Sequence, residues 1–204
     1  AAPGGQKDSA YLLDAIAGHG ITTIHFVPSM LEAFLQWLPA GADVGLKRIL
    51  CSGEALKGSQ VWLCREKLPQ VRLHNLYGPT EAAIDVSYWD VPDDGIKRQT
   101  IPMGQAVWNT RLYVADRFGN LVPRGVRGEL YIGGIQVSRG YLNQDQLTAE
   151  KFVPDVFSGV PGARLYKTGD HVRWLADGNL EYLGREDDQV KVRGYRIEPG
   201  EIES

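Results

Sequence analysis

The 204-residue sequence has little of what marks several common classes of protein. Its two cysteines, Cys51 and Cys64, are too few for a structural zinc site and too far apart for a CxxC redox motif. Its longest apolar runs, such as residues 21–27, are far shorter than the roughly 18 residues that cross a bilayer. With 22 lysines and arginines against 25 acidic residues, the sequence has no excess of basic residues to neutralise the phosphates of DNA or RNA. We therefore expect a cytoplasmic protein with buried thiols, no membrane span and no nucleic-acid partner.

What the sequence does contain predicts a folded, turn-rich protein. Hydrophobic residues make up 43% and charged residues 23%, which is typical of folded domains and argues against disorder. Its 24 glycines and 11 prolines are numerous, and they stand beside charged or aromatic residues rather than in a repeat. We expect them to form turns, some of them shaped for a ligand.

The first hundred residues alternate between helical and strand patterns. Helical spacing of apolar residues over 11–16, 28–38 and 59–68 alternates with strand-like runs at 21–27, 48–52 and 71–75. Pro28 and Ser29 can open the second helix, with Ser29 as its N-cap. The alternation predicts a mostly parallel sheet, whose ligands gather beyond the carboxyl ends of the strands.

After about residue 100 the pattern changes to short alternating segments at 111–115, 129–132, 171–174 and 180–182. These predict an antiparallel, β-rich unit. From Arg185 onward charge is dense, as in a solvated linker or a contact surface that moves. The predicted fold class is α/β plus β: an α/β subdomain part over 1–100, a β-barrel-like subdomain over 101–184, and the start of a small C-terminal subdomain over 185–204.

Two motifs follow predicted strands and carry chemistry. His74-Asn75-Leu76-Tyr77-Gly78-Pro79-Thr80-Glu81 makes a turn that lets backbone approach an anion, with a hydroxyl for phosphate and a carboxylate for Mg²⁺. By itself it is more often a plain turn with a capping threonine. Leu165-Tyr166-Lys167-Thr168-Gly169-Asp170 offers a carboxylate that can accept hydrogen bonds from both hydroxyls of a ribose, although Gly-Asp alone is mostly a turn.

Four ordered motifs resemble one known family. The segments NLYGPTE, GELYIGGIQVSRGYLN, YKTGD and GREDDQVKVRGYRIEPGEIE resemble the adenylation domains of nonribosomal peptide synthetases, which belong to the adenylate-forming superfamily. The resemblance covers essentially the whole chain. It implies an enzyme of secondary metabolite biosynthesis that activates an amino acid with ATP and Mg²⁺ and passes it to the phosphopantetheine thiol of a peptidyl carrier domain.

The resemblance also implies roles for individual residues. Thr80 and Glu81 would be catalytic, with Thr80 on phosphate and Glu81 holding Mg²⁺. Asp187 would be the hinge of the C-terminal subdomain. The nucleotide would be bound by Gly53, Glu54, Ala55, Asn75, Tyr77, Asp170, Tyr182 and Arg185. Catalysis of this kind is positioning and charge neutralisation, which agrees with the lack of a convincing Ser/His/Asp or Cys/His arrangement in the sequence.

The substrate pocket implied by the resemblance is small and has a polar floor. It maps to His25, Leu50, Ser52, Leu76, Ile84 and Asp85. A buried histidine and a buried aspartate are costly unless something bonds them, so they favour a substrate with a hydroxyl group. The set resembles serine-activating domains, although threonine or another small polar amino acid stays open. Alternatively, His25 is a satisfied core histidine and Asp85 an exposed strand residue.

Parts of the family pattern are missing from these 204 residues. The phosphate loop, the aspartate that holds the substrate ammonium and the lysine of the C-terminal subdomain have no counterpart, so we expect a fragment that is incomplete for catalysis alone. Alternatives are an acyl- or aryl-acid CoA ligase of the same superfamily, or a catalytically silent docking module. GELYIGG and QVKVRG favour the peptide synthetase branch. Expected partners are the neighbouring synthetase domains and a small MbtH-like activator protein.

Overall fold

The computed structural model describes residues 2–39, 42, 44–92, 100–185, 189–192 and 195–197, which form two compact units. The first unit takes in the described residues of 2–75, 90–101 and 190–197, and the second takes in those of 76–89 and 102–189. The hinge predicted at Asp187 lies outside the described residues. The predicted domain boundaries at 100 and 184 stay a prediction.

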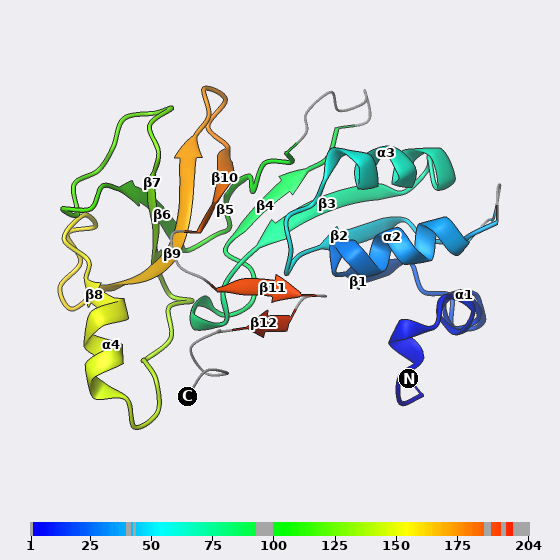
Figure 1. Ribbon diagram of the computed structural model, residues 1–204, viewed down its shortest axis with the longest axis horizontal. Coiled ribbons are helices and arrows are strands. Elements are labelled where there is room, and N and C mark those ends of the chain that lie inside the picture. The colour runs from blue at the N-terminus through cyan, green and yellow to red at the C-terminus, as the bar shows by residue number, and fades with distance from the viewer. Residues whose placement is uncertain are drawn as a thin grey trace. The chain divides into compact units, whose positions relative to one another are not determined.

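The first unit alternates helices and parallel strands, as Figure 1 shows. Its main elements are α1 (Ser9–Gly18), β1 (Thr23–Phe26), α2 (Pro28–Trp37), β2 (Arg48–Cys51), α3 (Gly58–Lys67) and β3 (Arg72–Tyr77), after a short 3₁₀ turn, η1 (Gly5–Lys7). β1 pairs with β2 and β2 with β3, both in parallel, with His25 opposite Leu50 and Leu50 opposite His74. The α/β fold class predicted from the sequence is therefore confirmed.

Local chemistry sets the ends of the helices. Asp8 caps α1, since its Oδ1 accepts the backbone N–H groups of Ala10 at 2.9 Å and Tyr11 at 3.2 Å. The prediction that Ser29 caps α2 was wrong. Val27 occupies the N-cap and Pro28 the first helical position, where a missing N–H costs nothing.

Apolar residues of the helices and strands form the core of the first unit. Fully or almost fully buried side chains include Leu31, Phe34 and Leu35 of α2, Ile49 of β2 and Leu73 of β3. The ring centroids of Phe26 and Phe34 lie 5.3 Å apart in a stacked arrangement. Both cysteines are buried and free, as the sequence predicts, and burial raises the pKa of the Cys64 thiol to about 11.

The second unit is mostly β-structure. Its elements are η2 (Thr80–Ala82), β4 (Ser87–Asp90), β5 (Gln105–Ala106), β6 (Thr110–Ala115), β7 (Gly128–Gly134), α4 (Asp145–Lys151), β8 (Phe152–Pro154), β9 (Arg164–Trp174) and β10 (Leu180–Arg185). A further antiparallel pair, β11 (Val190–Val192) and β12 (Tyr195–Ile197), follows in the chain.

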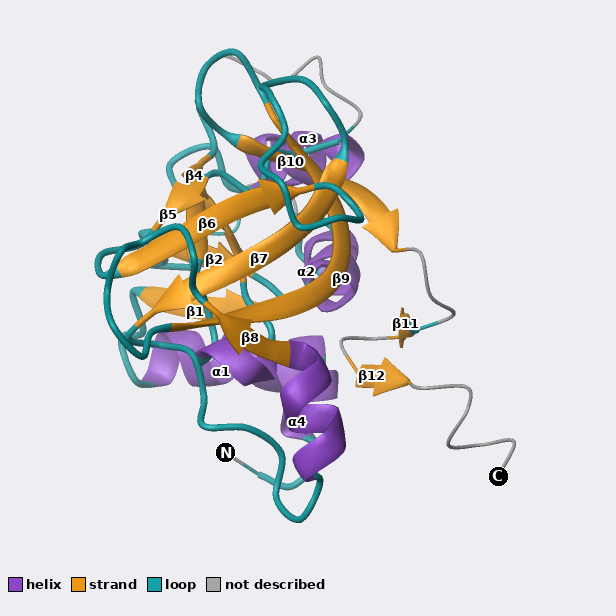
Figure 2. Cartoon of the chain, turned by 90° about the vertical axis from the view of Figure 1, so that its left-hand side faces the viewer, coloured by secondary structure: helices purple, strands orange, loops and turns teal. Residues whose placement is uncertain are grey.

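The sheets of the described residues are mixed and open. The first sheet has the order β1-β2-β3-β4-β5, and the second has the order β10-β9-β7-β6, with β8 also paired to β9. Figure 2 shows this second sheet as a curved but unclosed layer. Its described strands therefore form no closed barrel, because β6 and β10 are edges rather than partners.

A large cluster of buried apolar side chains supports the second sheet. Leu130 and Ile132 of β7, Val172 of β9 and Leu180 of β10 are its most buried members on the strands. The helices of the described residues include none that is long and apolar enough to cross a membrane.

Candidate active site

The site residues predicted from the sequence fall in both units. In the second unit the central residue is Asp170, which lies in a bulge of β9. Glu129 of β7 is opposite His171, but Tyr131 is opposite Lys167, so β9 carries extra residues between these pairs. Gly169 supplies the left-handed backbone within the bulge, with φ of 74°. The YKTGD motif is therefore the place where the hydrogen-bond ladder between β7 and β9 is interrupted, and the interruption changes the direction of the Asp170 side chain.

The carboxylate of Asp170 is buried and bonded on both oxygens. It is 5% exposed, its Oδ2 accepts the hydroxyl of Tyr77, and its Oδ1 accepts Nη1 of Arg185 at 2.8 Å. Burial, followed by the negative charge of Asp170, raises the pKa of Tyr77 well above its usual value, so the hydroxyl stays protonated and donates. An ionised carboxylate has about four acceptor positions, so Asp170 keeps capacity for further donors such as ribose hydroxyls.

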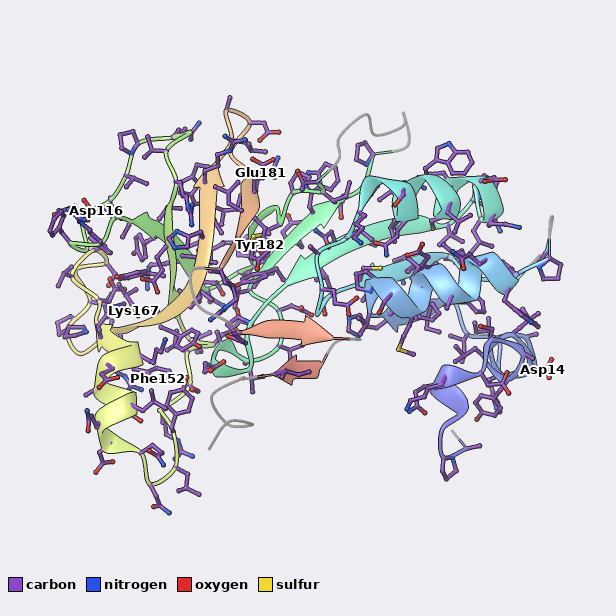
Figure 3. The ribbon with its side chains drawn as sticks, viewed as in Figure 1. Asp14, Asp116, Phe152, Lys167, Glu181 and Tyr182 are labelled. Carbon is purple, nitrogen blue, oxygen red and sulfur yellow. The ribbon has the colours of Figure 1, made fainter. Side chains whose placement is uncertain are left out.

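A second bulge brings Arg185 to Asp170. Tyr182 of β10 is opposite Val172, whereas Gly184 is opposite His171 and Arg185 opposite Asp170, so one extra residue separates these pairs. Without that residue Arg185 would move by one position and its side chain would leave this face of the sheet. Figure 3 shows Tyr182 and Glu181 as neighbours on β10, and Tyr182 is the one that packs on the buried cluster.

Two residues without an assigned role in the sequence analysis build the bulge of β9. The Thr168 hydroxyl donates to the Leu130 carbonyl at 2.8 Å and accepts the Asp170 N–H at 2.9 Å. Glu129 Oε1 accepts the Gly169 N–H at 2.9 Å. Both belong to motifs that carry the resemblance, GELYIGG and YKTGD, which is the signal that could have indicated them.

The turn at residues 78–81 carries an exposed threonine and a buried carboxylate. Thr80, at the start of η2, is exposed. Glu81 is 5% exposed, and its Oε1 accepts the hydroxyl of Tyr141 at 2.7 Å. Burial and the nearby Glu81 charge raise the pKa of Tyr166 far above its usual value, which keeps a second neutral phenol beside this carboxylate.

Glu81 fits a magnesium role in donor type. The described residues contain no group of three or more His, Cys, Asp or Glu side chains that could hold a metal ion by itself. Mg²⁺ commonly binds through one or two carboxylates together with substrate phosphates and water, and for this arrangement a single glutamate is sufficient.

The pocket residues predicted in the first unit are His25, Leu50 and Ser52. His25 Nε2 and the Ser52 hydroxyl are 2.8 Å apart and share a hydrogen bond between β1 and the end of β2. Ser52 is buried, but the expectation of a buried His25 was wrong because its side chain is exposed. The alternation of a strand explains this: Phe26 faces the core, so His25 faces the other way.

The nucleotide-binding residues predicted in the first unit are Gly53, Glu54 and Ala55, which follow β2, and Asn75 on β3. Gly53 has a left-handed φ of 88°, Ala55 is exposed, and Asn75 is buried opposite Cys51. Glu54 Oε2 accepts the Ser29 backbone N–H at 3.1 Å, so this carboxylate lies at the start of α2. A negative charge is favourable at a helix N-terminus.

The remaining pocket residues, Leu76, Ile84 and Asp85, lie in the second unit. Leu76 and Asp85 are partly buried and Ile84 is 75% exposed. A Cβ on Gly78 would stand 2.1 Å from the Ile84 carbonyl oxygen, so only glycine fits where the turn and this segment meet. Gln136 Nε2 donates to the backbone carbonyls of Ala83 and Asp85 in the same segment, and the sequence analysis assigned Gln136 no role.

The described residues therefore combine an α/β unit with a β-rich unit that holds the buried Tyr77–Asp170–Arg185 cluster. The chain belongs to the AMP-binding enzyme family, whose model matches residues 1–142. It is of the adenylation type found in nonribosomal peptide synthetases (NRPS), as the following relatives indicate.

Three relatives illustrate the similarity. The chain is 50% identical over its whole length to phosphinothricin tripeptide synthetase PhsB of Streptomyces viridochromogenes and spans 17% of that protein. It superposes on holo-PA1221, an NRPS protein containing adenylation and PCP domains, with a TM-score of 0.87, 29% identity, and coverage of 95% of this chain and 33% of the other. It also superposes on the Vibrio cholerae adenylation domain AlmE in complex with glycyl-adenosine-5'-phosphate, with a TM-score of 0.83, 32% identity, and coverage of 96% and 38%.

Proposed function

We propose that this chain contributes to a domain that joins an amino acid to ATP, releases pyrophosphate and forms an aminoacyl-adenylate. The observation that carries the proposal is the buried Tyr77–Asp170–Arg185 cluster, which presents a charged acceptor at the bulge of β9 in the second unit. AlmE, a structural relative, was solved with an aminoacyl-adenylate. The adenylated amino acid then passes to the phosphopantetheine thiol of a peptidyl carrier domain, which is the kind of domain that accompanies adenylation in PA1221.

Each nucleotide-binding residue has a role in this proposal. Asp170 accepts hydrogen bonds from the ribose hydroxyls, while Arg185 and Tyr77 fix the orientation of its carboxylate. Thr80 donates its hydroxyl to a phosphate oxygen. Glu81 holds Mg²⁺, which neutralises phosphate charge when it is bound. The remaining residues, Gly53, Glu54, Ala55, Asn75 and Tyr182, border the adenine and ribose.

The reaction needs positioning rather than a protein nucleophile. A carboxylate oxygen of the amino acid attacks the α-phosphorus in line, an oxygen–phosphorus bond forms, and pyrophosphate leaves as the opposite bond breaks. The protein holds the two reactants in this arrangement. Asp187 is proposed as the hinge between this step and transfer to the carrier thiol.

We propose L-serine as the amino acid. The His25–Ser52 hydrogen bond supports this choice, because it places two groups that can bond a hydroxyl side by side at the ends of β1 and β2. The resemblance assigns Asp85, Leu50, Leu76 and Ile84 to the same pocket. The proposal also includes a cytoplasmic location, neighbouring synthetase domains and an MbtH-like activator as partners.

The proposal is tested by substrate-dependent pyrophosphate exchange across the twenty amino acids, with the full-length protein. Serine should be preferred over alanine, because alanine offers these groups no hydroxyl; since His25 is exposed and already bonds Ser52, the preference should be smaller than the roughly 10⁴-fold of a fully buried hydroxyl site. Threonine, which differs by one methyl, should be disfavoured by roughly 10- to 200-fold. His25→Ala should reduce exchange with serine more than exchange with alanine. A maximum for a large or apolar amino acid would refute the serine assignment, and no exchange with any amino acid would refute amino-acid activation.

A further inference from the structure

The segment that carries two proposed pocket residues has an unusual backbone. Ala83 and Ile84 have φ of 46° and 76°, both in the left-handed region. The Asp85 N–H donates to the Ala83 carbonyl at 3.1 Å, which closes a three-residue turn centred on Ile84. Such a turn with a positive φ at its centre is rare, and a β-branched residue in it is an outlier. Strained backbone of this kind persists only where its surroundings hold it, and it concentrates at functional sites.

The glutamine at position 136 is the side chain that holds this turn. Its Nε2 donates to the carbonyl oxygens of Asp85 at 2.9 Å and Ala83 at 3.3 Å. Its Oε1 accepts the hydroxyl of Thr110, which fixes the orientation of the carboxamide. A primary amide has two N–H donors, and here they meet the two carbonyls on either side of Ile84.

The turn is also confined by the backbone at Gly78. A Cβ on Gly78 would stand 2.1 Å from the Ile84 carbonyl oxygen, so the backbone of the Gly-Pro-Thr-Glu motif is in direct contact with the turn. After the turn, the Val86 N–H donates to the Tyr77 carbonyl at 2.7 Å. The turn therefore contacts rigid backbone at Gly78 and an adjustable side chain, that of Gln136.

We propose that Gln136 is a positioning residue that sets amino-acid specificity by fixing the Ile84 and Asp85 side chains. The proposal rests on the proposed function, which places these two residues in the substrate pocket. Gln136 does not itself touch the substrate. Neither an aliphatic residue nor a glutamate could replace its amide, because both lack N–H donors and glutamate adds a negative charge beside two carbonyls.

The test uses Gln136→Met, which keeps the length of the side chain and removes both donors. In pyrophosphate exchange with the full-length protein, the KM for the preferred amino acid should rise about 10- to 100-fold, as expected for the loss of two hydrogen bonds. The KM for ATP should change by less than about twofold, because the turn bears pocket residues rather than the Asp170 cluster. The matched control is Gln146→Met on α4, where an exposed glutamine bonds only Glu150 at 3.1 Å and no change is expected.

A second substitution tests the mechanism itself. Ala83→Gly allows positive φ without steric cost, so it should recover a substantial part of the KM loss when combined with Gln136→Met. Strictly additive effects of Ala83→Gly and Gln136→Met would overturn the idea that Gln136 stabilises the strained turn. An equal rise of both KM values in Gln136→Met, together with a lower melting temperature, would show that Gln136 only supports the fold.

A direct readout separates this proposal from the proposed function. Hydrogen–deuterium exchange at the Asp85 amide should be faster in Gln136→Met than in the wild type and unchanged in Gln146→Met. Unchanged exchange at Asp85 overturns the role of Gln136 whatever the activity. If the wild type activates no amino acid, the proposed function fails and specificity control by Gln136 fails with it, while faster exchange still establishes that Gln136 holds the turn.

Discussion

Replacing Asp170 by asparagine removes one negative charge from a buried cluster while keeping the side-chain shape. The side chains of Arg185 and Asp170 are 11% and 7% exposed, so the cation cannot turn to water when its partner is neutralised. Breaking a buried ion pair by removing one partner costs about 3–5 kcal/mol. We expect the low end, about 3 kcal/mol, since Arg185 Nη1 also donates to the Thr168 carbonyl at 2.9 Å.

A second pair on the same two strands serves as the matched control. Arg173 and Glu181 are directly opposite each other on β9 and β10, with Nε and Oε2 2.6 Å apart. The Arg173 side chain is 44% exposed, so this pair is screened by water and contributes less than about 1 kcal/mol. Glu181→Gln should therefore change the free energy of unfolding much less than Asp170→Asn, although the distances in the two pairs are similar.

Urea denaturation followed by tryptophan fluorescence measures the difference in free energy of unfolding between the two variants. The KM for ATP in pyrophosphate exchange measures the effect of each variant on nucleotide binding. Loss of a charged acceptor for ribose hydroxyls is worth about 1.5–3 kcal/mol, so the KM for ATP should rise roughly 10- to 150-fold in Asp170→Asn. Equal stability losses in the two variants would refute the argument from burial. An unchanged KM for ATP would remove Asp170 from the nucleotide site.

Two further predictions concern the Gly-Pro-Thr-Glu turn. Glu81→Gln should preserve the fold, because the Tyr141 hydroxyl can still donate to the amide oxygen, but it should impair adenylation. Rates of pyrophosphate exchange over a range of Mg²⁺ concentrations test this. If both the exchange rate and its dependence on Mg²⁺ survive, the metal is held elsewhere. Gly78→Ala should destabilise the protein by about 1–3 kcal/mol, since its Cβ would collide with the Ile84 carbonyl. Gly18→Ala, which has nothing within 4 Å of its added Cβ, should be neutral or stabilising in the same thermal melts, and equal losses would contradict the steric argument.

Much of the fold could be predicted because its signals are local. The spacing of apolar residues over 28–38 identified α2, and the β-branched run at 21–27 contained β1. Alternation of such segments also predicted the parallel order of β1, β2 and β3. The N-cap of α2 was missed by two residues, because proline at the first helical position fixes the start of the helix.

The candidate site was predicted from motifs, which identify residues but not their partners. Asp170 and Tyr77 were both named from the sequence, yet their hydrogen bond joins residues 93 positions apart. Gln136 and Glu129 received no role although both lie in the motif GELYIGGIQVSRGYLN, because the motif does not reveal that they bond backbone groups of other segments. The exposure of His25 also depended on which face of β1 the core covers.

The sequence by itself therefore determined the order of helices and strands, the positions of the glycine turns and the identity of the residues offered to a nucleotide. Only the tertiary structure decided which way those residues point. The bulges in β9 and β10 shift the register by whole residues, and that shift is what places Arg185 opposite Asp170. Register is a property of paired strands, so the free energy that selects it comes from neighbours distant in the chain and leaves no periodic signal within either strand.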